Sequence, residues 1–162
     1  MRTKRKRVEV YTYTALDVLL ADPVNPYPID FQRHQLTRMW GGLRSIESSP
    51  NPTNDDWRVC SDAVNLMETL VTMGEVQDSS GLLADAIKGL AIAGARHMET
   101  GAPIRLDGPG MLAVRAVLED YAAVLAVLPH RTMVRCHRET ERRIREIMRG
   151  KVKPHDVEVM AL

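Results

Sequence analysis

Apolar residues recur three or four positions apart along most of the chain, which is the spacing of one face of an α-helix. This spacing predicts helices after Asp30, over residues 57–71, 82–98 and 111–128, and over a last segment from about Pro129 to Gly150. A shorter helix is predicted in TALDVLLAD, residues 14–22, before the proline-rich PVNPYPID. The expected fold is therefore all-α, a single-domain bundle of about five helices.

Alternating and β-branched residues indicate short β segments near both ends of the chain. VEVYTYT, residues 8–14, has this pattern, and DVEVMAL, residues 156–162, is the only comparable segment that could pair with it. We expect the chain to divide into a flexible basic arm over residues 1–7, a helical bundle domain over 8–153 and a C-terminal tail over 154–162.

The three most apolar segments, residues 57–73, 82–98 and 111–128, have broader apolar faces than a thin bundle buries on one side. Residues 82–98 have the narrowest polar strip and are predicted to form the central, most buried helix. Two alternatives follow for the remaining apolar surface: burial inside a monomer, or coverage by a second copy in a homodimer. Within the helix after Asp30, the pair Gly41-Gly42 either weakens the helix or lets another backbone approach closely.

Composition is that of an ordinary globular protein. Of the 162 residues, 44% are hydrophobic and 27% charged, whereas aromatics make up only 4%, so the core must be mainly aliphatic. No stretch approaches the roughly twenty apolar residues of a membrane span, and Glu9 and Asp17 interrupt what would be a secretory leader. Cys60 and Cys136 lack metal or redox spacing, so we expect buried free thiols and a cytoplasmic protein with no membrane association.

Charge is segregated along a chain whose net charge is only +1. Residues 1–9 carry +4, residues 10–129 carry −7, residues 130–153 carry +6, and residues 154–162 carry −2. Segregation of this kind points to partners for the basic segments.

The last predicted helix places six arginines within an arc of about 80°, at 100° per residue. We call this set the arginine stripe: Arg131, Arg135, Arg138, Arg142, Arg145 and Arg149. Met133, His137, Thr140, Ile144, Ile147 and Met148 fall on the opposite side. Because the stripe lies opposite this apolar face, Arg138 and Arg142 are expected to be replaceable with little loss of stability.

Two interpretations of the stripe compete. It is either a solvated face, with Glu139, Glu141 and Glu146 at pairing distance along the helix, or a face that binds phosphate or carboxylate groups. The twofold excess of arginine over glutamate favours binding. The basic arm, through Lys4, Arg5, Lys6 and Arg7, would extend such a face if it lies on the same side.

No catalytic or metal-binding motif is present in the sequence. The five histidines include no pair at helical ligand spacing, and GxSxG, P-loop and HExxH patterns are absent. Cys136 and His137 are adjacent, so on a helix their side chains point about 100° apart and cannot form a thiolate-imidazole couple. We therefore expect no enzymatic activity, no cofactor and no metal.

These observations favour a small non-enzymatic cytoplasmic protein that binds nucleic acid, or a complex containing nucleic acid, through the arginine stripe and the basic arm. The alternative is a protein-interaction module or inhibitor that docks on an acidic partner protein. Small size, a basic arm and the absence of catalytic motifs resemble the accessory proteins of bacterial mobile elements.

Overall fold

The computed structural model describes residues 11–150, which form six α-helices and no strand. They are α1 (Ala15–Leu20), α2 (Ile29–Ser48), α3 (Asn54–Thr72), α4 (Leu83–Thr100), α5 (Gly108–Val127) and α6 (His130–Met148). The all-α prediction is confirmed, with one helix more than the expected five or so. Residues 11–14 are not a strand, because they lead directly into the cap of α1. Residues 8–10 and 156–162 of the expected β segments, the basic arm and the C-terminal tail lie outside the described residues.

Local capping explains where several helices begin. Thr14 and Asp17 form a capping box at α1, and Thr53 and Asp56 form one at α3. At α5 the Asp107 carboxylate accepts a hydrogen bond of 2.7 Å from the amide of Gly110. The sequence places the start of α2 after Asp30, with Asp30 as its cap. This expectation is wrong, because the helix already begins at Ile29, after Pro28.

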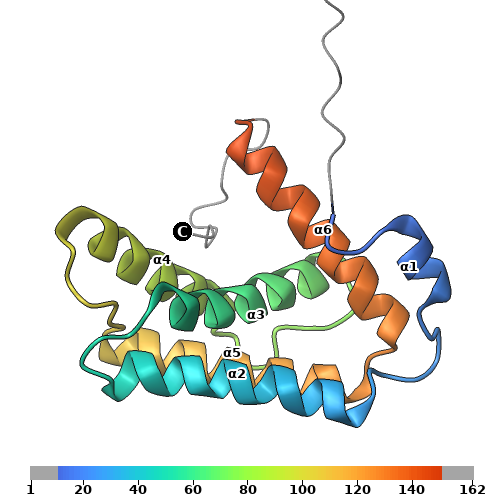
Figure 1. The fold of residues 1–162 in the computed structure, drawn as a ribbon, viewed down its shortest axis with the longest axis horizontal. Coiled ribbons are helices and arrows are strands. Elements are labelled where there is room, and N and C mark those ends of the chain that lie inside the picture. Colours follow the sequence, from blue (N-terminus) through green and yellow to red (C-terminus); the bar gives the residue numbers. More distant parts are fainter. Residues whose placement is uncertain (1–10, 151–162) are drawn as a thin grey trace, which may run out of the picture.

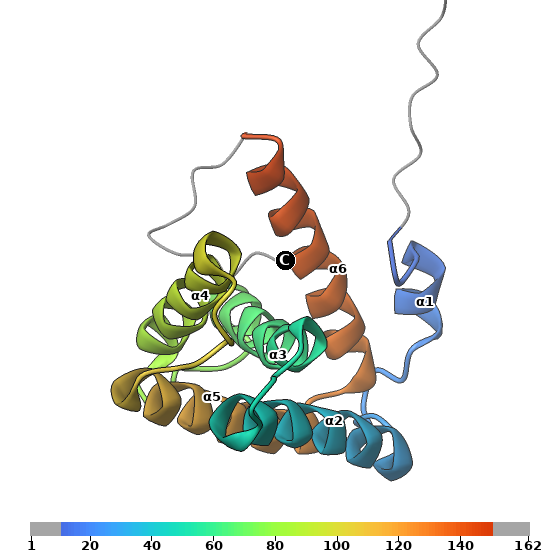
Figure 2. The ribbon, with the colours of Figure 1, turned by 60° about the vertical axis from the view of Figure 1, so that its left-hand side comes forward.

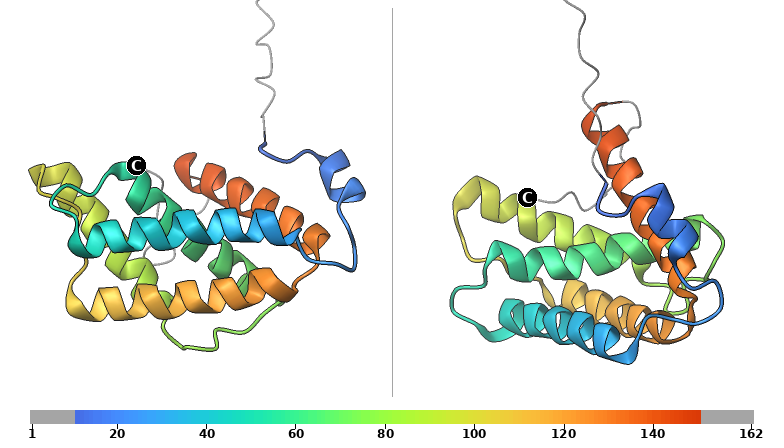
Figure 3. Two further views of the ribbon diagram at one scale, coloured as in Figure 1. Left: turned by 60° about the horizontal axis from the view of Figure 1, so that its bottom comes forward. Right: turned by 45° about the vertical axis from the view of Figure 1, so that its right-hand side comes forward.

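The helices form two layers with a flanking helix. Figure 1 shows α2 and α5 running side by side below α3 and α4. In Figure 2, α2 to α5 form a four-helix body, α6 leans against α3, and α1 lies on the far side of α6. The right-hand view in Figure 3 shows that α6 projects past the layers at its C-terminal end.

The central helix is α3, not the segment 82–98 that its narrow polar strip predicted. Helix α3 contacts α2, α4, α5 and α6, and ten of its residues are buried, against six in α4. Helix α4 has an outward face on which Ile92 and Met98 are exposed. Position between the layers, rather than apolar content, therefore decides which helix is most buried.

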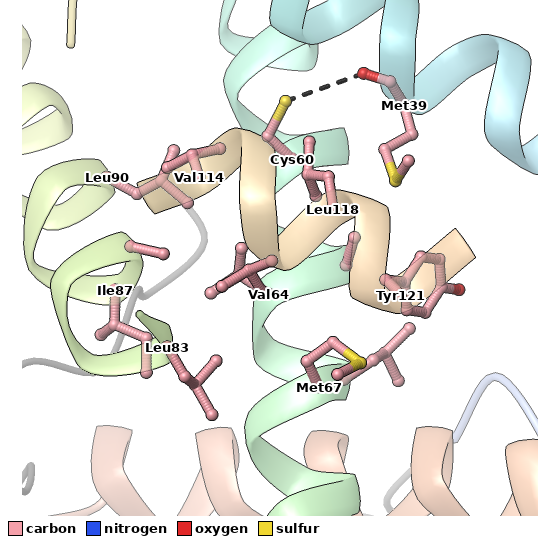
Figure 4. Close-up of a cluster of buried hydrophobic side chains, with 14 of the residues drawn as sticks. Met39, Cys60, Val64, Met67, Leu83, Ile87, Leu90, Val114, Leu118 and Tyr121 are labelled. Carbon is pink, nitrogen blue, oxygen red and sulfur yellow. Dashed lines mark hydrogen bonds between the residues drawn. The ribbon is translucent and has the colours of Figure 1, made fainter. Parts of the chain in front are cut away.

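The core is one continuous apolar cluster. Side chains from α2, α3, α4 and α5 converge in it, as Figure 4 shows around Val64, Leu90 and Leu118. Trp57 is 1% exposed, and its indole N–H donates a 2.9 Å hydrogen bond to the carbonyl of Leu90. Many apolar side chains of the three broad segments are thus buried within one chain, whereas Ile92, Met98, Leu112 and Val127 are exposed.

Both cysteines are free and buried, as predicted. The thiol of Cys60 faces the carbonyl of Met39 at 3.8 Å (Figure 4), and that of Cys136 faces the carbonyl of Leu66 at 3.4 Å. Burial raises the pKa of each thiol to about 12, so neither is a thiolate near neutral pH.

Within residues 11–150, none of the helices has the length and apolar character needed to cross a membrane.

Candidate anion-binding face on α6

Helix α6 is held in place on both sides. Its apolar side buries Met133, Val134, Cys136, Thr140 and Ile147. At its start the amides of His130 and Arg131 donate to the carbonyls of Asn25 and Asp22, at 2.8 and 2.9 Å. The loop after α1 therefore satisfies amides that a helix N-terminus leaves without intrahelical partners.

The arginine stripe divides into two rows, each with members seven positions apart. Arg131, Arg138 and Arg145 form the inner row and are half-buried, whereas Arg135, Arg142 and Arg149 form the outer row and are exposed. Seven residues on an α-helix rotate by about 700°, so each row runs almost parallel to the helix axis. One row faces the N-terminal segment, and the other faces solvent.

The inner row binds the backbone of residues 11–21. Arg131 donates to the carbonyls of Ala21 and Leu19, at 3.1 and 2.9 Å. Arg138 donates to the carbonyl of Tyr13 at 2.7 Å. These guanidinium groups hold α1 and the residues before it against α6.

The ring of Tyr11 also contacts the arginine stripe. The guanidinium carbons of Arg138 and Arg145 lie 5.1 and 4.1 Å from the centre of its ring, within cation-π range. The amide of Thr12 donates to the carboxylate of Glu141 at 3.1 Å.

These contacts correct the expectation that Arg138 is replaceable without loss of stability. Its side chain is half-buried and bonded to Tyr13, so a charge reversal there would also release the N-terminal segment. Arg142 makes no such contact with another element and is consistent with the expectation.

The outer row is exposed but has carboxylates beside it. Arg142 pairs with Glu139 at 2.6 Å and with Glu146 at 2.7 Å, and the hydrogen bond to Glu139 is the main cause that raises the pKa of Arg142. Arg135 lies 3.8 Å from Glu75, in the turn that follows α3. The side chains of Arg135 and Arg142 are 53% and 46% exposed, so the stabilisation from these pairs is small, about 0–1 kcal/mol each.

A hollow of about 380 Å³ opens between the N-terminal segment and α6. Its lining residues are Tyr11, Val18, Met73, Arg135, Arg138, Glu139 and Arg142. Three arginines and one glutamate give this lining a net charge of +2. The hollow therefore combines an apolar side with convergent guanidinium groups, the arrangement that suits an anionic group on a larger ligand.

Arg143, the one arginine of α6 that the stripe does not include, has a structural position. It is 19% exposed, pairs with Glu68 at 3.1 Å and donates to the Thr69 hydroxyl at 2.9 Å. Arg143 therefore joins α6 to α3. Arg145 and Glu141 do lie near each other, at 3.9 Å.

Cys136 and His137 do not form a catalytic couple. The Cys136 thiol points to α3, whereas the imidazole of His137 meets the ring of Tyr13 edge to face at 5.3 Å. Burial lowers the pKa of His137 to about 4, so the imidazole is neutral near neutral pH.

The depressed pKa of His137 predicts a pH-dependent stability. In the unfolded chain His137 is protonated below about pH 6.5, whereas in the folded chain it stays neutral down to about pH 4. The free energy of unfolding therefore falls between these two pH values and levels off below them. The loss expected from this one group is about 1–3 kcal/mol. We expect His137→Gln, measured by urea unfolding at pH 7 and pH 4.5, to lose less stability on acidification than the wild type. Equal losses in both proteins would contradict the assignment.

Among residues 11–150, no three His, Cys, Asp or Glu side chains are grouped so that they could hold a metal ion. Comparison with known proteins gives no match to a family model, to a curated protein or to a solved structure.

Sequence reasoning found six arginines of this face but missed the residues that complete it. Tyr11, Val18 and Met73 come from the N-terminal segment, α1 and the end of α3. The aromatic pattern at residues 8–14 was a signal for a contact, but it indicated a strand rather than a partner for arginine. Lys4, Arg5, Lys6 and Arg7 lie outside the described residues.

Proposed function

We propose that the protein binds nucleic acid through phosphate contacts, with the outer row and the hollow as the primary site and the basic arm as its extension. The role is binding rather than catalysis, in the cytoplasm. Recognition of this kind is electrostatic and largely independent of base sequence.

The observation that carries the proposal is the position of Tyr11. This residue lines the hollow and contacts Arg138 and Arg145, so the chain reaches the arginine stripe at the point where the basic arm is attached. Covalent geometry then keeps Arg7 within about 14 Å of Tyr11 and Lys4 within about 25 Å. Both basic segments are therefore close enough along the chain to contact one polyanionic ligand.

The chemistry of the site favours phosphate binding over the alternative that the arginine stripe is only a solvated face. Arginine presents a planar fork of donors that matches two phosphate oxygens. The carboxylates beside the outer row belong to exposed pairs that contribute little, so a polyanion with several phosphates can replace them.

The test is binding of a labelled DNA duplex to the full chain, compared with Arg135→Gln/Arg142→Gln. Both side chains are exposed and neither anchors the N-terminal segment, so the melting temperature is expected to change little. With four phosphate contacts, from Arg138 and the outer row, wild-type affinity falls roughly 150-fold between about 50 and 200 mM salt. Loss of two contacts should reduce the slope of log affinity against log salt by about 1.8.

The matched control is Arg58→Gln/Arg96→Gln, which removes the same charge from exposed positions of α3 and α4. It should keep the wild-type slope. Equal slopes for all three proteins would refute the proposal and would mean that the arginine stripe is a solvated face without a ligand. If an acidic polyglutamate peptide binds more tightly than duplex DNA and single-stranded RNA, the ligand is an acidic protein instead.

A further inference from the structure

Exposed apolar side chains gather in one short part of the chain. Of the ten large hydrophobic residues that are most exposed within residues 11–150, five lie between Leu16 and Ile29. We call four of them the α1 ridge: Leu16, Leu19, Leu20 and Val24, each between 59% and 75% exposed. A concentration of this kind marks an interaction surface, whereas single exposed apolar residues do not.

A second uncovered apolar surface follows one face of α2. It is a groove of about 610 Å³, lined by Ile29, Gln32, Arg33, Leu36, Thr37, Trp40, Gly41 and Arg44. Leu36 and Trp40 pack partly against the core and leave their outer sides in the groove. The size and shape suit apolar side chains from another helix.

Gly41, which also lines this groove, makes no close contact within residues 11–150 that would require a glycine. A β-carbon at Gly41 would meet no atom within 4 Å, whereas one at Gly42 would lie 2.4 Å from Val59 Cγ2. A glycine in an exposed helix interior is unfavourable, by about 1 kcal/mol relative to alanine. The absence of a side chain at Gly41 is useful only where something outside the chain approaches the helix closely.

The two surfaces are complementary in charge. Residues 14–25, which carry the α1 ridge, include Asp17 and Asp22 and no basic residue. The groove lining includes Arg33 and Arg44 and no acidic residue. Helix α1 packs on α6 through the inner row, so its ridge points away from its own bundle and does not cover the groove of the same chain.

We propose that the protein is a reciprocal homodimer in which the α1 ridge of each copy occupies the α2 groove of the other. Because each chain carries both surfaces, a twofold arrangement buries two identical contacts at once. Leu19 and Leu20 meet Trp40 and pass closest to the helix at Gly41. The inference does not depend on nucleic-acid binding.

The first test is the mass of the full chain in solution, by light scattering after size exclusion, over concentrations up to about 100 μM. The wild type should have the mass of two chains. Gly41→Gln fills the groove, and Leu19→Gln/Leu20→Gln makes the ridge polar; each should weaken dimerisation at least tenfold. At low protein concentration, where the monomer dominates, Gly41→Gln should melt no lower than wild type, because its side chain meets open space in the monomer.

The matched control is Met98→Gln/Leu112→Gln, which removes two equally exposed apolar side chains from α4 and α5. This variant should dimerise like the wild type.

A mixing experiment distinguishes ridge-in-groove contact from any other dimer. Neither variant retains an intact ridge-groove pair in its own homodimer, but a mixture of Gly41→Gln with Leu19→Gln/Leu20→Gln restores one pair of the two. The mixture should therefore form heterodimers more tightly than either variant forms homodimers. A monomeric wild type at all concentrations, or a mixture no tighter than its components, would overturn the proposal.

Discussion

Replacing Trp57 by alanine is expected to lower the free energy of unfolding by about 3–5 kcal/mol. The side chain is buried in the central helix, and the ring lies directly against Gly94 of α4. Its removal leaves a cavity between α3 and α4 and leaves the carbonyl of Leu90 without the indole donor. Few single substitutions in the described chain remove as much packing.

Urea unfolding followed by circular dichroism measures this loss. Trp57→Phe keeps most of the ring but cannot donate to Leu90, so its loss should be smaller, about 1–3 kcal/mol. A loss below about 1 kcal/mol for Trp57→Ala would mean that the contact between α3 and α4 is not part of the core.

Substituting the two adjacent glycines of α2 by alanine is expected to change stability in opposite directions. At Gly42 the new methyl would lie 2.4 Å from Val59 Cγ2 and 2.7 Å from the backbone oxygen of Asp56, so α2 and α3 must move apart. The cost is about 1–3 kcal/mol. At Gly41 the methyl meets no neighbour, and the gain from helix propensity is about 1 kcal/mol.

Thermal unfolding of both variants at low protein concentration gives the sign directly, because the monomer then dominates. Gly42→Ala should melt below the wild type and Gly41→Ala above it. Equal melting temperatures for the two variants would show that α2 and α3 do not cross at Gly42.

Structural features that depend only on residues a few positions apart can be predicted from the sequence. Apolar residues three and four positions apart identified the helices, and Thr14, Thr53 and Asp107 start three of them because a cap needs only the amides two or three residues ahead. The arc of the arginine stripe is also a local property, since it follows from rotation along one helix. Burial of both cysteines followed from the same periodicity.

On α6, helical spacing alone does not predict which arginines contact other elements. Inner and outer rows differ by only about 40° around the helix, yet one binds the N-terminal segment and the other is exposed. An arginine side chain is long enough to reach partners on either side, so helical spacing alone does not select one. Glu119 lies one helical turn ahead of Arg115, but Arg115 pairs with Glu47 of α2 at 3.0 Å.

The three-dimensional arrangement of the helices determines which positions meet residues distant in the sequence. It made α3 rather than α4 the central helix, because burial depends on how many other helices surround a segment and not on its own composition. It also distinguishes Gly42, where close approach of α3 requires a glycine, from Gly41, where no contact among residues 11–150 does. The two glycines are equivalent in helix propensity, and their difference exists only because α2 crosses α3 on one side and faces solvent on the other.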